Sequence, residues 1–150
     1  MNQTLRRLIA SQTDFSMNLT NHISTNQSPT AANVVISALS IHLLLSLIAT
    51  GSNGKTLYQI ITFLQLPSSS KQDLTDLASE IINVVLANRS SPTAPRISFA
   101  NGVWFDKSFP INPSFKQVAA RSYQSQIQDV DFQNMVRFLI LPLINLLDFA

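Results

Sequence analysis

Residues 49–56 carry the side chains best suited to bind phosphate. They read Ala-Thr-Gly-Ser-Asn-Gly-Lys-Thr, and a loop ending in Gly-Lys-Thr at a helix N-terminus can hold phosphate on backbone N–H groups, with Lys55 on the outer oxygens and Thr56 on magnesium. Ala49 replaces the first glycine of the stricter pattern, however, and the preceding residues look like a buried helix rather than a parallel strand. We therefore interpret the two glycines as turn residues and Thr56 as a helix N-cap.

Hydrolytic and metal chemistry have few candidate side chains. The chain has no cysteine, two histidines, His22 and His42, and no Gly-x-Ser-x-Gly motif, which a serine hydrolase would need to bring a nucleophile and base together. A metal site would require both histidines to meet Asp129 and Asp131 from distant elements, and Glu80 is the only glutamate, which disfavours paired-carboxylate chemistry. We expect His42 to be a satisfied core or surface histidine. We predict no catalytic, cofactor-binding or metal-binding residue, no cofactor and no enzymatic activity.

The elements that would position these residues are mostly helical in the first half of the chain. Leu8, Phe15, Leu19 and Ile23 form a helical stripe. Residues 34–36 are three consecutive apolar residues and predict a buried strand. Residues 37–50 are apolar nearly all round, which is typical of a buried helix, with Ser37 as its N-cap and Gly51 as its left-handed stop.

The second half mixes helices with strands. A helix beginning at the capping box of Thr56 should end at Pro67, and a surface helix should follow, with Leu74, Leu77, Ala78, Ile81 and Val85 on one face. Alternation from Ile97 to Phe105 predicts a long strand. Asn112 before Pro113 marks the start of another helix, and a last strand is expected through residues 127–132.

Charge and hydropathy restrict the partners. The net charge is +2 with the basic residues scattered, so we predict no nucleic-acid binding. Residues 135–150 are apolar but shorter than the roughly 20 residues that span a bilayer, and Arg137 is their only basic residue, so membrane contact is not expected. The first ten residues lack the apolar core of a secretory signal, which favours a cytoplasmic protein.

Several segments, in order and spacing, resemble the serpin family, and most of all its plant members. They are Asn-Val-Val-Ile-Ser-Ala-Leu-Ser-Ile at 33–41, Gly-Ser-Asn-Gly-Lys-Thr at 51–56, Ala-Asn-Gly-Val-Trp-Phe at 100–105, Pro-Ser-Phe at 113–115 with Tyr123, and Val-Asp-Phe at 130–132. The resemblance covers residues 13–133. It implies an α+β, truncated serpin fold, mostly helical (helices A to E) with short pieces of sheets A and B. The predicted organisation is residues 1–133 as the N-terminal part of a serpin domain and residues 134–150 as an apolar tail that does not match the family.

The resemblance also carries functional expectations. It places Asn33, Ser37 and Ser40 in the shutter region, where sheet A opens to admit the reactive-centre loop, and it puts Ala38 where the family has proline. After Phe132 the family continues through further strands to that loop, which is absent from this chain, so a non-inhibitory member of a serine-type endopeptidase inhibitor family is expected. By family resemblance an extracellular location stays open. Two alternatives also remain: a protein whose exposed helix faces bind a protein partner, and a nucleotide-binding protein using Gly54-Lys55-Thr56.

Overall fold

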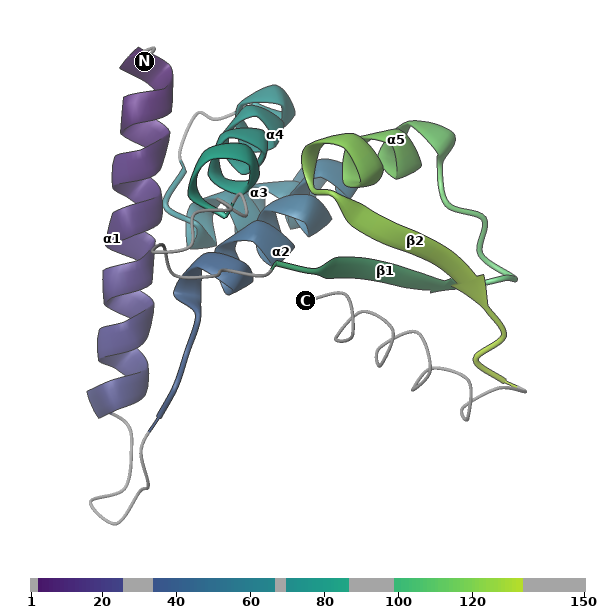
Figure 1. Cartoon of the computed structure of the whole chain (residues 1–150), viewed down its shortest axis with the longest axis horizontal. Coiled ribbons are helices and arrows are strands. Elements are labelled where there is room, and N and C mark those ends of the chain that lie inside the picture. Colours follow the sequence, from purple (N-terminus) through teal and green to yellow (C-terminus); the bar gives the residue numbers. More distant parts are fainter. Residues whose placement is uncertain (1–2, 26–33, 67–69, 87–98, 134–150) are drawn as a thin grey trace, which may run out of the picture. The chain divides into compact units, whose positions relative to one another are not determined.

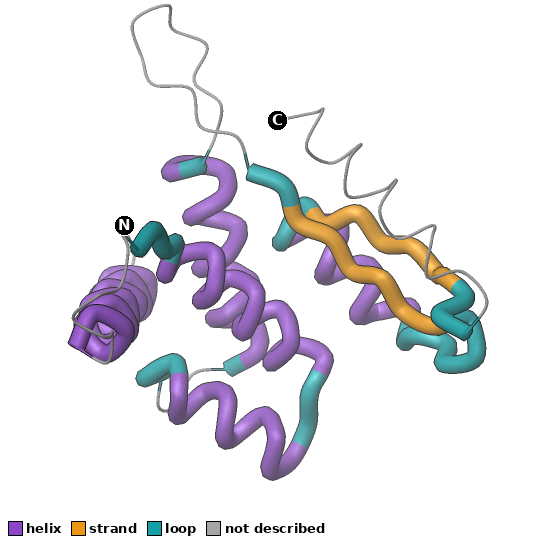
Figure 2. The backbone as a smooth tube through the Cα atoms, turned by 90° about the horizontal axis from the view of Figure 1, so that it is seen from below, coloured by secondary structure: helices purple, strands orange, loops and turns teal. Residues whose placement is uncertain are grey.

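The computed structural model describes residues 3–25, 34–66, 70–86 and 99–133, and the chain divides into two units, residues 1–78 and 79–150. The predicted α+β class, mostly helical with a short sheet, is confirmed (Figures 1 and 2). The elements in chain order are α1 (Gln3–Thr25), α2 (Ala38–Gly51), α3 (Gly54–Phe63), α4 (Lys71–Glu80), the π-helical turn η1 (Ile81–Val85), β1 (Asn101–Asp106), α5 (Pro113–Ser122) and β2 (Ser125–Val130).

The core of the first unit forms where α1 packs on α2. Leu8 and Phe15 are buried, as the predicted stripe requires, while Leu19 and Ile23 are half-buried. The Phe15 ring meets the His42 ring of α2 edge-on at 5.5 Å between centroids. Aromatic pairs favour this arrangement because the positive edge of one ring faces the negative face of the other. The first helix is therefore held by an aromatic contact as well as by apolar burial.

Only one side of α2 is buried in the described structure. Leu43 and Leu47 are almost completely buried, but Leu44 and Ile48 keep 47% and 46% of their surface exposed. The prediction of a helix buried all round is therefore met on one face, and a second apolar face of α2 is open within this unit.

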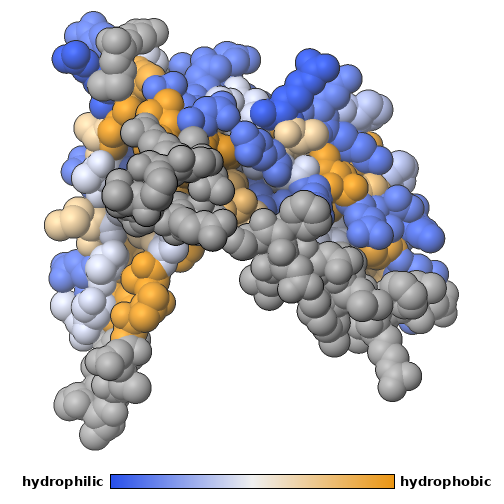
Figure 3. Space-filling view, viewed as in Figure 1, coloured by the Kyte–Doolittle hydropathy of each residue, from blue (hydrophilic) through white to orange (hydrophobic). Residues whose placement is uncertain are grey.

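The buried strand predicted at residues 34–36 is wrong. The described structure assigns no strand there, and Val35 is 98% exposed. Figure 3 shows hydrophobic surface along the segment that leads into α2. An apolar run becomes a buried strand only when another strand supplies its backbone hydrogen bonds, and no strand pairs with it among the residues that the structure describes.

The turn between α2 and α3 differs from the prediction at both ends. Gly51 is the last residue of α2, and the glycine with a positive φ is Gly54, at 55°. The helix α3 begins at Gly54 with Asn53 as its N-cap, so Thr56 lies inside the helix and is not the cap. A left-handed residue suits the tight turn itself rather than the end of α2, because Ser52 already closes α2 by donating its backbone N–H to the Ala49 carbonyl.

The helix α3 ends before Pro67, which lies outside the described residues. Gln65, at φ 58°, donates its backbone N–H to the Thr62 carbonyl, and Leu66 donates to the Ile61 carbonyl. These two bonds form a Schellman motif, which satisfies the last carbonyls of the helix. Glutamine occupies the left-handed position that glycine usually takes there.

The face predicted for the next helix is correct until the π-helical turn. Leu74, Leu77, Ala78 and Ile81 are buried, but Val85 is 55% exposed. The Leu86 N–H bonds to the Ile81 carbonyl, five residues back, so the turn holds one residue more than an α-helical turn. The extra residue rotates Val85 off the buried face.

The second unit contains a strand–helix–strand arrangement with a parallel sheet. β1 pairs with β2 from Asn101 opposite Ser125 to Asp106 opposite Val130, and α5 lies along one face of the sheet (Figures 1 and 2). Asn112 caps α5 by accepting the backbone N–H of Ser114, with proline at the first helical position as predicted. β1 has six residues, so the long strand is confirmed only from residue 101, and Ile97 lies outside the described residues.

Candidate functional site

The residues expected from resemblance to form a shutter lie at the start of α2. Ser37 is extended, and its Oγ accepts the backbone N–H of Ser40 at 3.3 Å, which confirms the predicted N-cap. The two hydroxyl oxygens are 2.7 Å apart. Asn33 lies outside the described residues, so the structure brings together two of the three predicted residues.

The paired serines cap a helix and carry no sign of nucleophile activation. Both side chains are exposed, and in the part of the chain that the structure describes neither hydroxyl is hydrogen-bonded to an imidazole or a carboxylate. A serine nucleophile needs such a base to remove its proton. The arrangement supports a structural role at the helix start.

His42 lies one turn beyond the cap and is fully buried. Its core position agrees with the prediction, but the expectation that it is satisfied is wrong, because neither ring nitrogen has a hydrogen-bond partner among the described residues. Burial lowers the pKa of His42 to about 4, since the charged ring would lose its hydration. His42 is therefore a neutral imidazole at pH 7.

The Gly-Lys-Thr loop does not form a phosphate site in this structure. It follows the helix α2 instead of a strand, and Lys55 is the second residue of α3, with an exposed side chain. Asn53 accepts a hydrogen bond from the Lys71 ammonium at 3.0 Å, so the turn is tied to the start of α4. These contacts support the interpretation of the loop as a helix connection.

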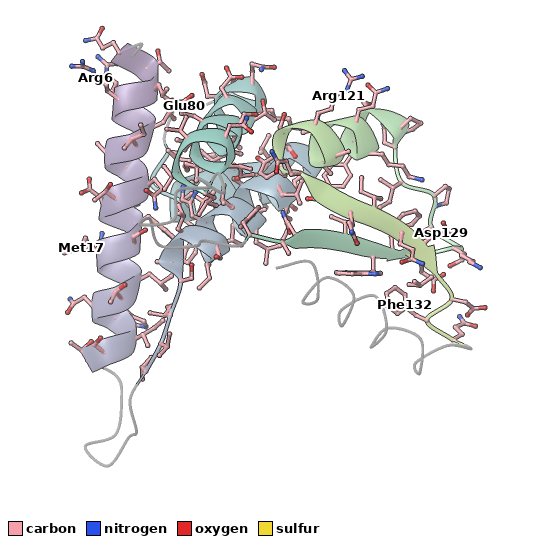
Figure 4. All side chains as sticks on the ribbon, in the orientation of Figure 1. Arg6, Met17, Glu80, Arg121, Asp129 and Phe132 are labelled. Carbon is pink, nitrogen blue, oxygen red and sulfur yellow. The ribbon has the colours of Figure 1, made fainter. Side chains whose placement is uncertain are left out.

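The acidic residues also fail to assemble a metal centre. In the described ranges, no group of three or more histidine, cysteine, aspartate or glutamate side chains could hold a metal ion. Asp129 lies on β2, in the second unit, and is exposed (Figure 4). Asp131 follows that strand, whereas His22 and His42 belong to the first unit.

Asp106 is a polar anchor that the sequence analysis did not single out. Its carboxylate accepts the Ser108 backbone N–H at 2.8 Å, the Ser108 hydroxyl and the Phe132 backbone N–H at 3.2 Å. The Ser108 hydroxyl and N–H lower the pKa of Asp106, because both bonds favour the charged form. The Asp-Lys-Ser spacing is the signal that could have indicated this turn.

No helix among the described residues is both long and apolar enough to cross a bilayer.

Comparisons with known proteins agree on one family. The family model described as "Serpin (serine protease inhibitor)" matches residues 10–139. Serpin-ZX of Arabidopsis thaliana is 43% identical over 130 residues, which are 87% of this chain and 32% of the relative. Serpin-Z2A of Triticum aestivum is 41% identical over 129 residues, which are 86% of this chain and 32% of the relative.

Solved structures give the same result. The native stressed conformation of Arabidopsis AtSerpin1 is 40% identical, with a TM-score of 0.82, and the match covers 97% of this chain and 36% of that structure. Cleaved lamprey angiotensinogen, at 20% identity and a TM-score of 0.77, shares the fold. The chain thus spans about a third of the length of the curated relatives it matches.

Proposed function

The chain belongs to the serpin family, and from that premise we propose that these 150 residues do not by themselves inhibit a protease. The proposal rests on how small a part of each relative this chain matches. Relatives at about 40% identity match nearly nine-tenths of this chain, but the match accounts for only 32% of each of them. The family resemblance locates the reactive-centre loop far beyond the segment that resembles residues 13–133, and nothing after Phe132 resembles that loop.

Serpin inhibition needs a loop that inserts and a sheet that receives it. In the family, the cleaved loop enters sheet A as an additional strand and carries the bound protease with it, so that stored strain traps the enzyme. The described residues contain a sheet of two six-residue strands. A sheet of two strands is marginal alone, and without a loop there is no strand to insert. We therefore expect no inhibition by strain release from these 150 residues.

The division of the chain is part of the same proposal. Residues 1–133 form the N-terminal part of a serpin domain, and residues 134–150 are an apolar extension of a different character. The family model ends at residue 139, within that extension. The described elements from α1 to β2 all lie before it.

The test is a search for covalent complexes. The purified chain is incubated with trypsin-like, chymotrypsin-like and papain-like proteases, and residual activity and denaturing gels are measured over time. We expect unchanged protease activity, no gel-stable complex and progressive digestion of the chain. A full-length serpin that forms such a complex with the same enzyme is the positive control. A covalent complex with the 150-residue chain would overturn the proposal.

A further inference from the structure

The sequence contains two Asn-Gly dipeptides, Asn53-Gly54 and Asn101-Gly102. In such a pair, the backbone nitrogen of the glycine can attack the side-chain amide carbon of the asparagine and form a cyclic imide. Glycine permits this attack because it has no side chain to hinder the close approach. The structure places the two dipeptides in different surroundings, so their reactivities should differ.

Asn53-Gly54 lies in the exposed turn between α2 and α3. A Cβ built on Gly54 would meet nothing within 4 Å, and the Gly54 N–H is a first-turn donor, which has no intrahelical carbonyl to bind. The Leu57 N–H bonds to the Asn53 carbonyl at 3.4 Å, which is longer than the roughly 2.7–3.2 Å of typical bonds. This weak first bond of α3 lets the Asn53–Gly54 peptide rotate from its extended ψ of 167° toward ring closure.

Lys71 contacts the amide that would react. The Asn53 side chain makes no cap bond to α3, and its Oδ1 accepts a hydrogen bond from Lys71 Nζ at 3.0 Å. Negative charge develops on this oxygen when the Gly54 nitrogen adds to Asn53 Cγ, and a positioned ammonium group stabilises that charge. Lys71 therefore makes the amide carbon of Asn53 more electrophilic.

Asn101-Gly102 is held in the β1–β2 sheet instead. Asn101 pairs with Ser125 and Gly102 pairs with Gln126, and both residues of the dipeptide are half-buried. A Cβ built on Gly102 would overlap the Trp104 ring, so the indole covers this part of the backbone. Ring closure at Asn101 would require the strand to separate from its partner, and the sheet therefore protects this dipeptide.

We propose that Asn53 is a site of spontaneous deamidation assisted by Lys71, whereas Asn101 is protected. The Gly54 nitrogen gives its proton to hydroxide and forms a bond to Asn53 Cγ, and the side-chain nitrogen leaves as ammonia. Water then opens the imide at either carbonyl, which gives aspartate or isoaspartate. The sum is the consumption of water and the release of ammonia, without oxidation or reduction. This inference does not depend on whether the chain inhibits a protease.

The two products change the turn in different ways. An aspartate at position 53 places a negative charge beside Lys71 and at the start of α3, where a helix dipole favours it. Isoaspartate instead adds a methylene group to the main chain at the residue whose carbonyl accepts the first bond of α3. In both cases the net charge of +2 falls by one. Deamidation therefore alters the connection between α2 and α3 as the protein ages.

The first test compares the two asparagines within one molecule. The chain is incubated at mildly alkaline pH, and mass spectrometry of its peptides measures the deamidated fraction at each dipeptide over time. Asn53 should react about fivefold faster than Asn101 or more, because reaction at Asn101 has to await local opening of the sheet. In urea that unfolds the chain, the two rates should converge. Equal rates in the folded chain would overturn the proposal, as would a rate ratio that is the same with and without urea.

The second test concerns Lys71. Lys71→Met removes the ammonium group and should slow deamidation of Asn53 in the folded chain about threefold, a modest donor effect because the site is exposed to water. Lys71→Arg keeps a charged donor and should retain most of the parent rate. The matched control is Lys107→Met, which removes the same charge from an exposed position in the second unit and should leave the rate unchanged. An unchanged or faster reaction in Lys71→Met would show that the ammonium group gives no assistance.

Discussion

At the scale of single residues, His42 is the described core residue with two buried polar atoms that lack a hydrogen-bond partner. Its ring is fully buried against Phe15, and both nitrogens lack a hydrogen-bond partner among the described residues. An unpartnered polar group in an apolar interior costs about 1–3 kcal/mol. At neutral pH this free-energy cost is that of burying a neutral imidazole. The cost increases when the ring is protonated, because a buried charge loses more hydration.

The first prediction follows from that protonation. Burial lowers the pKa of His42 from 6.5 to about 4, so the unfolded chain binds this proton more tightly than the folded chain. Stability is therefore present above pH 6.5 and is lost as the pH falls from 6.5 to about 4, by about 3 kcal/mol in total at 1.36 kcal/mol per pH unit. His42→Leu should remove this loss and stabilise the first unit by about 1 kcal/mol at pH 7.5. Urea unfolding followed by far-ultraviolet circular dichroism between pH 4 and pH 7.5 measures both effects.

His22 offers the matched control, since it is the other histidine of the chain and is exposed on α1. His22→Leu should leave the acid-dependent loss in place. If the loss persisted unchanged in His42→Leu, the source would lie in the carboxylates and not in the buried imidazole.

At the scale of elements, the residues at the start of α2 affect the stability of the first unit. Ser37 is extended, with φ −108° and ψ 90°, and Ala38 is the first helical residue. Proline suits this position because its fixed φ is helical and its missing N–H is one that a first-turn residue does not need. The residue before a proline must be extended, as Ser37 already is.

The second prediction is that Ala38→Pro stabilises the chain by about 0.5–1 kcal/mol, mainly by restricting the unfolded state. Ala38→Gly, which widens the freedom of the same position, should destabilise it by about 1 kcal/mol. Urea midpoints of the two variants and the parent give the comparison. Because Ala38 is nearly buried, a destabilised proline variant would mean that the ring overfills the site and that alanine is the better fit here.

The elements also explain which features the sequence could predict. The Ser37 and Asn112 caps and the burial of Phe15 depend on local spacing, and they were predicted correctly. The strand at residues 34–36 depends on a pairing partner, which local sequence does not report. The exposure of Val85 depends on one π-helical turn, and the left-handed Gln65 depends on a Schellman motif without its usual glycine. For the candidate site, the shutter role of Ser37 and Ser40 stays a prediction from resemblance, whereas Asp106 was missed because its third donor, the Phe132 N–H, comes from 26 residues away.

At the scale of the whole molecule, the chain contains two units that are held together by different contacts. In the first, α1 and α3 both pack on α2; in the second, β1 pairs with β2 and α5 packs on β2. These closest element pairings all lie within one unit or the other. Two-state unfolding requires that all parts lose structure together, and such coupling is weak when each unit holds its own set of contacts.

The last prediction is therefore that the two units unfold in separate transitions. Trp104 reports on the second unit alone, because it is the single tryptophan, whereas the far-ultraviolet signal at 222 nm comes mainly from α1, α2 and α3 of the first unit. In urea, the two signals should give different midpoints, and His42→Leu at pH 5 should raise the far-ultraviolet midpoint while leaving the Trp104 midpoint unchanged. Coincident midpoints that both move in His42→Leu would mean that the residues from α1 to β2 fold as one cooperative body, because a substitution in the first unit would then reach the reporter of the second.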